Sequence, residues 1–348
     1  MRISMLLSYA GGFKEAVKEV QLLEKAGLDL VWVPEAYSFD APSAMGYLAA
    51  NTERITIASG ILPIYSRTPS LLAMTAAGID YLSDGRCMLG LGASGPQVIE
   101  GFHGVPYTHP VPRIREIIEI CRKVWRREPV VHDGDHYQIP LPQNKGTGLG
   151  KPLKLINHPV REEIPIAVAA LGQKSVEMTA ELADAWLPAF YTAEAAQAVW
   201  GNALQSGARQ RDPDRNPLEV FAGGAVAIGE GLEDLRNRAR PQIALYVGGM
   251  GARSKNFYND IFSRSGYEAE AKQIQDLYLA GDKKAAEAAI PDSYLERNSL
   301  IGPSGFVRER IQALQESGVT ALNVGFLGST TEERVSNCEK LREIVDSL

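Results

Sequence analysis

The chain has 348 residues, of which 45% are apolar, so it can bury a large core as one large domain or two smaller ones. A formal net charge of −6, with scattered Lys and Arg, gives no basic surface for nucleic acid. No apolar run approaches the roughly 20 residues that span a bilayer. Cys87, Cys121 and Cys338 share no C-x-x-C spacing. We therefore expect a cytoplasmic protein with reduced thiols that binds neither nucleic acid nor a membrane.

Apolar, strand-like segments alternate with amphipathic helical segments along the chain. A strand over residues 3–9 is followed by helical spacing from residue 13, which Gly27 ends. The same order then repeats to the end of the chain. We expect further strands at 29–34, 55–61, 87–92, 164–169, 185–187, 220–227 and 321–326, and further helices at 42–51, 69–83, 113–127, 174–182, 193–206 and 307–316.

Eight strands that alternate with helices predict an α/β protein with a parallel sheet covered by helices. The number of units favours a closed (β/α)₈ TIM barrel, and an open doubly wound sheet is the alternative. Residues 128–163 and about 228–320 do not fit the repeat, so we expect them to be insertions. We expect residues 1–348 to form a single barrel domain.

A G-x-G-x-x-G pattern occurs at Gly90, Gly92 and Gly95, directly after an apolar run. In a dinucleotide-binding fold this pattern belongs to the first strand–helix turn, with an acidic residue ending the next strand. Here three expected strands come first, and the acids at the required distance, Glu116 and Glu119, lie in a helical pattern. The position therefore favours the end of a fourth barrel strand.

In a TIM barrel, chemistry belongs at the carboxyl ends of the strands, where the strand–helix loops meet. Two of these strand ends carry Leu-Val-Trp-Val-Pro-Glu and Ser-Gly-Ile-Leu-Pro, within the segments 26–36 and 59–69, and the segments 82–86, 89–97 and 100–104 follow in the chain. Together and in this order they resemble the luciferase-like monooxygenase superfamily. Within it they look most like the deazaflavin-dependent oxidoreductases that are often labelled methylenetetrahydromethanopterin reductase-like.

The resemblance implies a TIM barrel that binds coenzyme F420 and transfers a hydride between C5 of the deazaflavin and a small organic substrate. It also implies a non-prolyl cis peptide at Gly60–Ile61 that presses on one face of the ring. An FMN-dependent monooxygenase on the same barrel and a non-catalytic flavin- or deazaflavin-binding protein are the alternatives. A homodimer is common in the family. The implied ring contacts are Ser59, Gly60, Ile61, Gly92, Ala93 and Ser94.

Glu35 is the candidate catalytic residue. It follows the second expected strand, where partial desolvation can raise a carboxyl pKa into a useful range for acid–base chemistry. Relatives often place Asp-His here, and this chain has Glu35 and Ala36. The alternative is that Glu35 is structural, as an acceptor of backbone hydrogen bonds or in an ion pair with Arg67.

Gly172, Gln173 and Lys174 follow the fifth expected strand and open a helix, whose amino end suits the phosphodiester of the coenzyme. A solvated first helical turn is the alternative reading, and Arg253 and Lys255 are weaker candidates for contacts to the acidic tail of the coenzyme. His132 and His136 have metal-like spacing, but Gly134 between them indicates a turn, so we expect no metal site. Candidate residues on the substrate side are Tyr9, Tyr65, Arg67, His103 and Tyr191.

Overall fold

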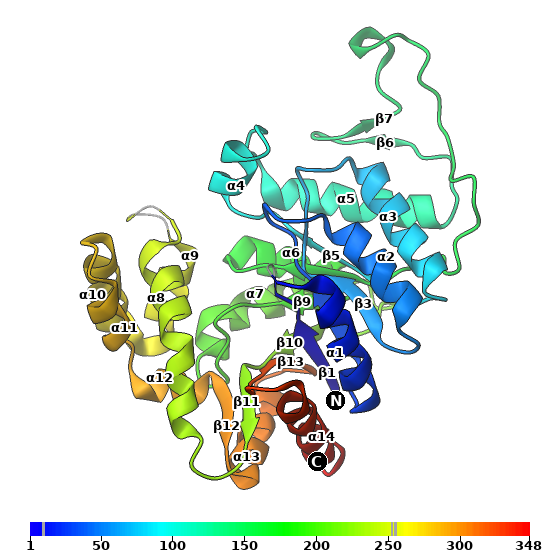
Figure 1. Cartoon of the computed structure of the whole chain (residues 1–348). Helices are drawn as coiled ribbons and strands as arrows, with labels where there is room; N and C mark the ends of the chain where they lie inside the picture. The colour runs from blue at the N-terminus through cyan, green and yellow to red at the C-terminus, as the bar shows by residue number, and fades with distance from the viewer. Residues whose placement is uncertain (9–10, 252, 254–255) are drawn as a thin grey trace.

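The computed structural model describes residues 1–8, 11–251, 253 and 256–348. Eight parallel strands form a barrel, and β1 pairs with β13 from Arg2–Ala321 to Met5–Val324, which closes it (Figure 1). The predicted closed barrel is confirmed, and the open sheet is excluded. In barrel order the strands are β1 (Arg2–Leu6), β2 (Leu30–Val33), β3 (Thr56–Ser59), β5 (Cys87–Gly92), β8 (Ile166–Ala169), β9 (Ala185–Leu187), β10 (Glu219–Ala222) and β13 (Ala321–Phe326).

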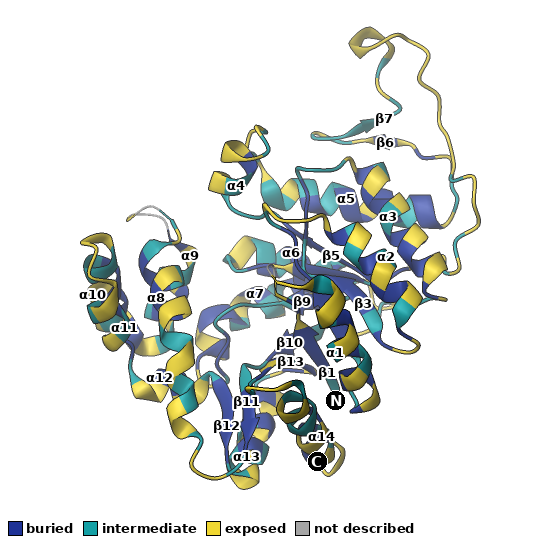
Figure 2. Cartoon of the chain, in the orientation of Figure 1, coloured by how far each residue is buried: buried dark blue, intermediate teal, exposed yellow. Residues whose placement is uncertain are grey.

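An outer layer of helices covers the barrel, and the helices carry buried residues on one side and exposed residues on the other (Figure 2). In the first helix, for example, Val17, Val20 and Leu23 are buried at helical spacing. The barrel interior is itself packed, with Trp32 against the edge of Phe221. The outer helices are α1 (Phe13–Lys25), α2 (Ala41–Asn51), α3 (Pro69–Leu82), α5 (Pro110–Trp125), α6 (Gln173–Leu182), α7 (Ala196–Gln210), α13 (Ser304–Glu316) and α14 (Thr331–Asp346).

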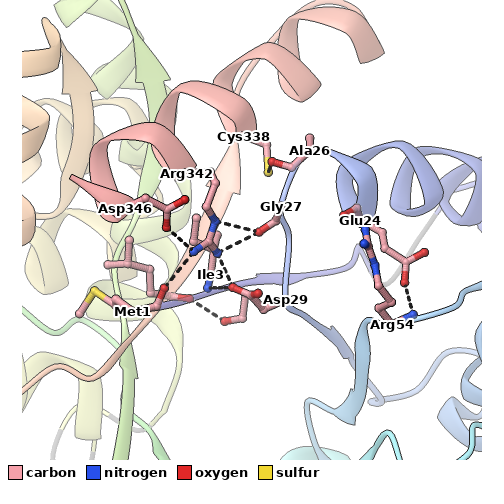
Figure 3. Close-up of polar contacts among 12 residues, drawn as sticks. Met1, Ile3, Glu24, Ala26, Gly27, Asp29, Arg54, Cys338, Arg342 and Asp346 are labelled. Atoms are coloured by element: carbon pink, nitrogen blue, oxygen red, sulfur yellow. Dashed lines mark hydrogen bonds and ion pairs between the residues drawn. The ribbon is translucent and has the colours of Figure 1, made fainter. Parts of the chain in front are cut away.

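Polar contacts at the amino ends of the strands join the first and last units of the barrel (Figure 3). Arg342 of α14 donates to the carbonyl oxygens of Gly27 and Met1 and pairs with Asp29. The Asp29 carboxylate also accepts the N–H of Ile3 at 2.7 Å. Side-chain hydrogen bonds to backbone groups that would otherwise be unpaired therefore fix β1, β2 and α14 together.

The segment predicted as one strand at 220–227 is two strands, which corrects the expectation. β10 ends at Ala222, and β11 (Ala225–Ile228) leaves the barrel, pairing with the end of β13 and with β12 (Ser299–Gly302). Gly223 and Gly224 allow this break: a Cβ on them would lie 2.6 Å from the carbonyl oxygen of Asn323 and 2.3 Å from that of Asn298. β12 was missed because it lies inside a segment that reads as helical.

Two segments lie outside the strand–helix repeat of the barrel. Residues 128–163 form an extended arm that projects from the barrel and contains β6 (His132–Asp133), β7 (Gln138–Ile139) and the 3₁₀ turn η1 (Gln143–Lys145) (Figure 1). The second segment is a helical bundle beside the barrel, with an apolar core of its own around Phe262, Ile274 and Tyr294. It comprises η2 (Glu233–Ala239), α8 (Arg240–Gly249), α9 (Phe257–Phe262), η3 (Ser263–Tyr267), α10 (Glu268–Leu279), α11 (Lys283–Ala288) and α12 (Asp292–Arg297). No helix in the described part of the chain is long and apolar enough to cross a membrane.

Candidate functional site

Glu35 and Arg67 form a two-point ion pair at the carboxyl ends of the strands, which we call the barrel mouth. Arg67 donates from Nη1 to Oε1 at 2.5 Å and from Nη2 to Oε2 at 2.8 Å. The backbone N–H of Ala41 also donates to Oε2, at 2.8 Å. The ion pair considered as the structural alternative for Glu35 is thus confirmed. Both carboxylate oxygens of Glu35 are therefore engaged within the protein.

The end of β3 presents bare backbone. The Gly60–Ile61 peptide is cis, as the resemblance implied. A Cβ on Gly60 would lie 2.8 Å from Cβ of Trp32 and 3.2 Å from Cδ1 of Leu6, so only glycine fits between these neighbours. Leu6 ends β1 beside it with 44% of its surface exposed, whereas Ile61 is half-buried. This part of the mouth therefore offers a neutral, apolar surface.

Ser59 does not offer its side chain to a ligand. It is completely buried, and its hydroxyl donates to the carbonyl oxygen of Gly90 and accepts that residue's N–H. A Cβ on Gly90 would lie 1.8 Å from the carbonyl oxygen of Ser59, and one on Gly92 would lie 2.8 Å from Cγ1 of Ile61. The glycine pattern in β5 therefore serves close packing against the β3 end and the bulge after it.

The chain beyond β5 crosses the mouth through α4 (Pro96–Gly101). Ala93 and Ser94, two of the implied ring contacts, are half-buried, and Ser94 has a left-handed φ of 58°. Such a conformation is uncommon for a residue other than glycine and is enriched at functional sites.

His103 follows α4 and has a buried Nε2 atom without a hydrogen-bond partner in the described part of the chain. Its ring meets the edge of Phe102 at 5.3 Å between centroids. Buried polar atoms in native proteins are nearly always hydrogen-bonded, so Nε2 of His103 keeps an unused hydrogen-bonding capacity beside Phe102.

Gly172 is the N-cap residue of α6, and the described helix has no side-chain hydrogen bond at this cap. Gln173 is exposed, but its amide Nε2 donates to the carbonyl oxygen of Val199 at 2.6 Å. Lys174 is exposed. Phe257 of α9 approaches Gly172, with Cε1 3.8 Å from the position of a Cβ. The backbone N–H groups of the first turn and Lys174 are thus the groups here that suit an anion. Arg253 pairs instead with Asp276, and Lys255 lies outside the described residues.

Two of the predicted substrate residues, Tyr65 and Tyr191, have hydroxyl groups that are hydrogen-bonded within the protein. The Tyr65 hydroxyl donates to the carbonyl oxygen of Thr108 at 2.8 Å, and burial raises the pKa of Tyr65 to about 12. Tyr191 is buried, stacks on Trp200 at 5.6 Å and donates to the carbonyl oxygen of Ser317. Tyr9 lies outside the described residues.

Three exposed aromatic residues, Tyr37, Phe39 and Phe102, lie on the loops beyond β2 and β5, and the sequence analysis missed them. The rings of Tyr37 and Phe102 lie 6.1 Å apart. The available signal was the pair of aromatic residues within four positions after Glu35.

His132 and His136 lie in the β6–β7 hairpin, where Gly134 donates to the carbonyl oxygen of Tyr137 within the turn, as predicted. His132 Nε2 lies 3.1 Å from Oε2 of Glu116 on α5, which ties the arm to the barrel. No cluster of three or more potential metal-ligating side chains occurs within the described ranges.

Comparison with known proteins agrees with this geometry. The sequence profile of the luciferase-like monooxygenase family matches residues 1–321. The chain belongs to this family. A relative from Mycobacterium tuberculosis, described as "Putative coenzyme F420-dependent oxidoreductase", is 36% identical over 329 residues, which cover 93% of this chain and 94% of the relative.

Two further members of the comparison are reductases. A 5,10-methylenetetrahydromethanopterin reductase from Archaeoglobus fulgidus is 26% identical over 308 residues and 88% of this chain, and the match covers 87% of that protein. The structure of the coenzyme F420-dependent tetrahydromethanopterin reductase from Methanopyrus kandleri superposes with a TM-score of 0.81 at 19% identity, over 99% of both chains. This likeness shows that the luciferase-like barrel fold extends over the whole chain.

Proposed function

We propose that this chain is a coenzyme F420-dependent oxidoreductase that transfers a hydride between the deazaflavin and a small organic substrate. The observation that carries the proposal is the 36% identity, over 93% of the chain, to a relative described by that activity. When bound, the coenzyme supplies a carbon centre that donates or accepts a hydride. The protein's part is to bind and orient the reactants, exclude water and handle a proton.

The residues at the mouth fit such a group. The uncharged backbone of Gly60 and Ile61, beside the exposed apolar side chain of Leu6, suits one face of a flat ring. Ala93 and Ser94 would hold the ring from the end of β5. The amino end of α6, with Gly172, Gln173 and Lys174, would hold the phosphodiester and acidic tail through backbone N–H groups and one positive charge.

Glu35 and His103 would divide the proton chemistry. The Glu35 carboxylate is held by Arg67 and by the N–H of Ala41, so it would position Arg67 or accept a proton from the substrate. Reduction of a substrate needs a proton donor, and His103, whose Nε2 has no partner among the described residues, is the candidate.

Turnover assays decide between this function and its alternatives. We expect the purified protein to oxidise reduced F420 in the presence of a carbonyl or activated alkene substrate, without consuming oxygen. An FMN-dependent monooxygenase would instead consume oxygen with reduced FMN. A binding protein would hold the coenzyme and transfer no hydride to any member of a broad substrate panel. Either of these results would refute the proposal.

We also propose that the protein is a homodimer in a reducing compartment, the cytoplasm. The outward side of α3 consists of exposed apolar residues, Leu71, Met74, Tyr81 and Leu82, and the arm exposes Leu149, Leu153 and Ile156. Several exposed apolar side chains on one helix face are typical of protein interfaces. The three cysteines are unpaired and buried, which supports the reducing compartment.

Light scattering tests the dimer and should give twice the chain mass. The double variant Met74→Glu with Tyr81→Glu should give a monomer, and a monomeric parent protein would refute the dimer.

A further inference from the structure

We propose that the substrate has a large apolar body that binds to Tyr37, Phe39 and Phe102, and a single carbonyl or hydroxyl group that hydrogen-bonds to Nε2 of His103. We call the three aromatic residues the aromatic rim. This inference rests on the proposed function and names the substrate class of the same site.

The aromatic rim exposes an unusual amount of ring surface at the mouth. Phe39 is 91% exposed, Tyr37 68% and Phe102 66%. They come from two loops that are separated in the chain by the whole of β3 and α3, yet Tyr37 and Phe102 contact each other. Large aromatic side chains gathered at a ligand mouth gain stability when an apolar molecule covers them. An anionic substrate would gain nothing from these three rings.

The loop that carries Tyr37 and Phe39 is held at both ends. Glu35 is fixed by Arg67, and its carboxylate also binds the N–H of Ala41 beyond the loop. The carboxylate of Asp40 accepts the N–H of Ser43 at 3.1 Å and so caps α2. A loop anchored in this way is pre-organised, so a ligand pays less ordering entropy when it binds.

The polar half of the site is His103. Its ring packs against Phe102, so the unpaired Nε2 lies next to the aromatic rim. A buried polar atom without a partner is unfavourable, and one hydrogen bond between Nε2 and a ligand oxygen removes that deficit. One oxygen beside an extensive apolar body is therefore the chemistry that both features recognise together.

A graded series of ketones tests the inference with the holoenzyme. Acetone, cyclohexanone and 2-acetonaphthone carry the same carbonyl on an increasing apolar body. In each reduction the carbonyl carbon accepts a hydride and its oxygen takes a proton, with one reduced deazaflavin consumed per ketone. We expect KM to fall along the series. In Phe102→Ala and Phe39→Ser, KM for 2-acetonaphthone should rise about tenfold, with little change for acetone.

Binding without the coenzyme separates this inference from the proposed function. Calorimetry should show 2-acetonaphthone binding to the parent protein, and weaker binding to the rim variants even if no hydride is ever transferred. Leu279→Ala, which removes a half-exposed apolar side chain from α10, is the matched control and should bind normally. Equal affinity of the parent protein and the rim variants would overturn the role of the rim.

The hydrogen bond has its own control. His103→Leu should weaken binding of 2-acetonaphthone but leave binding of 2-ethylnaphthalene, which lacks the oxygen, unchanged. His103→Gln should restore the affinity for the ketone. Equal losses of affinity for both probes would overturn the role of Nε2.

Two further results would overturn the rim as a substrate site. One is loss of the dimer mass in the rim variants, and the other is rim-dependent sedimentation with vesicles of phosphatidylcholine and phosphatidylglycerol.

Discussion

Glu35 and Arg67 lie 32 residues apart in the sequence, and their side chains form a two-point ion pair with 6% and 13% exposure. The pair joins the loop beyond β2 to the loop beyond β3. It also holds the start of α2, because the N–H of Ala41 binds the same carboxylate. One buried interaction thus sets the shape of this side of the barrel mouth.

Removing one partner of this pair should be strongly destabilising. We expect Glu35→Ala to lower the free energy of unfolding by about 3–5 kcal/mol, because it leaves the guanidinium of Arg67 buried and unpaired. The double variant Glu35→Gln with Arg67→Met should recover part of the loss, since it removes both charges. Denaturant unfolding measures the free energy of unfolding of both variants. A loss below about 1 kcal/mol in Glu35→Ala would mean that water already screens the ion pair.

The role of Glu35 in turnover is a separate question. If Glu35 accepts the substrate proton, Glu35→Gln should remove one limb of the pH profile for substrate oxidation, while KM for the coenzyme stays within about twofold. An unchanged rate and pH profile would limit Glu35 to holding Arg67.

Gly90 should not tolerate a side chain. Gly90→Ala would place a Cβ 1.8 Å from the carbonyl oxygen of Ser59, between two barrel strands. We expect a loss of about 3 kcal/mol or more, or no soluble protein. Gly305→Ala in α13 is the matched control, because no atom lies within 4 Å and alanine favours a helix. Similar melting temperatures for the two variants would contradict the packing account of β5.

The arm should detach from α5 in acid. Burial disfavours the charged form of Glu116, but the hydrogen bonds from His132 and from the N–H groups of His136 and Tyr137 together outweigh this, so the pKa of Glu116 lies below its usual value. Because its pKa is lowered, the Glu116 carboxylate stabilises the folded state at pH values above about 4.5, the ordinary pKa of a glutamate. This stabilisation is lost as the pH falls through the lower pKa that Glu116 has in the folded protein.

Hydrogen exchange across residues 132–139 measures this effect. After correction for intrinsic rates, protection should stay constant from neutral pH down to about pH 4.5 and fall below it. Glu116→Gln should lack most of this protection already at neutral pH. Glu119→Gln is the control: its carboxylate is half-exposed and 3.9 Å from His132, so its effect should be smaller. Protection that does not depend on pH in the parent protein would refute this account of the arm.

Lys174 should contribute to coenzyme affinity through charge. We expect Lys174→Ala to weaken binding of F420 about threefold at low salt, with the difference vanishing as salt screens the charge. Lys151→Ala, an exposed lysine on the arm, should have no effect. If the two variants bind alike at low salt, the acidic part of the coenzyme does not lie at the amino end of α6.

The sequence predicts the barrel well because its signals are local. The apolar runs at 87–92, 185–187 and 321–326 coincide with β5, β9 and β13 as the structure has them. The break between β10 and β11 and the whole of β12 were missed, because a four-residue strand inside a long segment has no distinctive period. The bonding of Ser59 to Gly90, and the burial of Tyr191 against Trp200, depend on tertiary neighbours that no spacing reveals.

Coenzyme choice tests the central claim most directly. Oxidised F420 and oxidised FMN would each be titrated into the purified protein, and binding followed by calorimetry. Our account predicts that F420 binds in the micromolar range or tighter, that FMN binds at least about tenfold more weakly, and that Lys174→Ala reduces the affinity for F420. Tight binding of FMN without binding of F420 would contradict it.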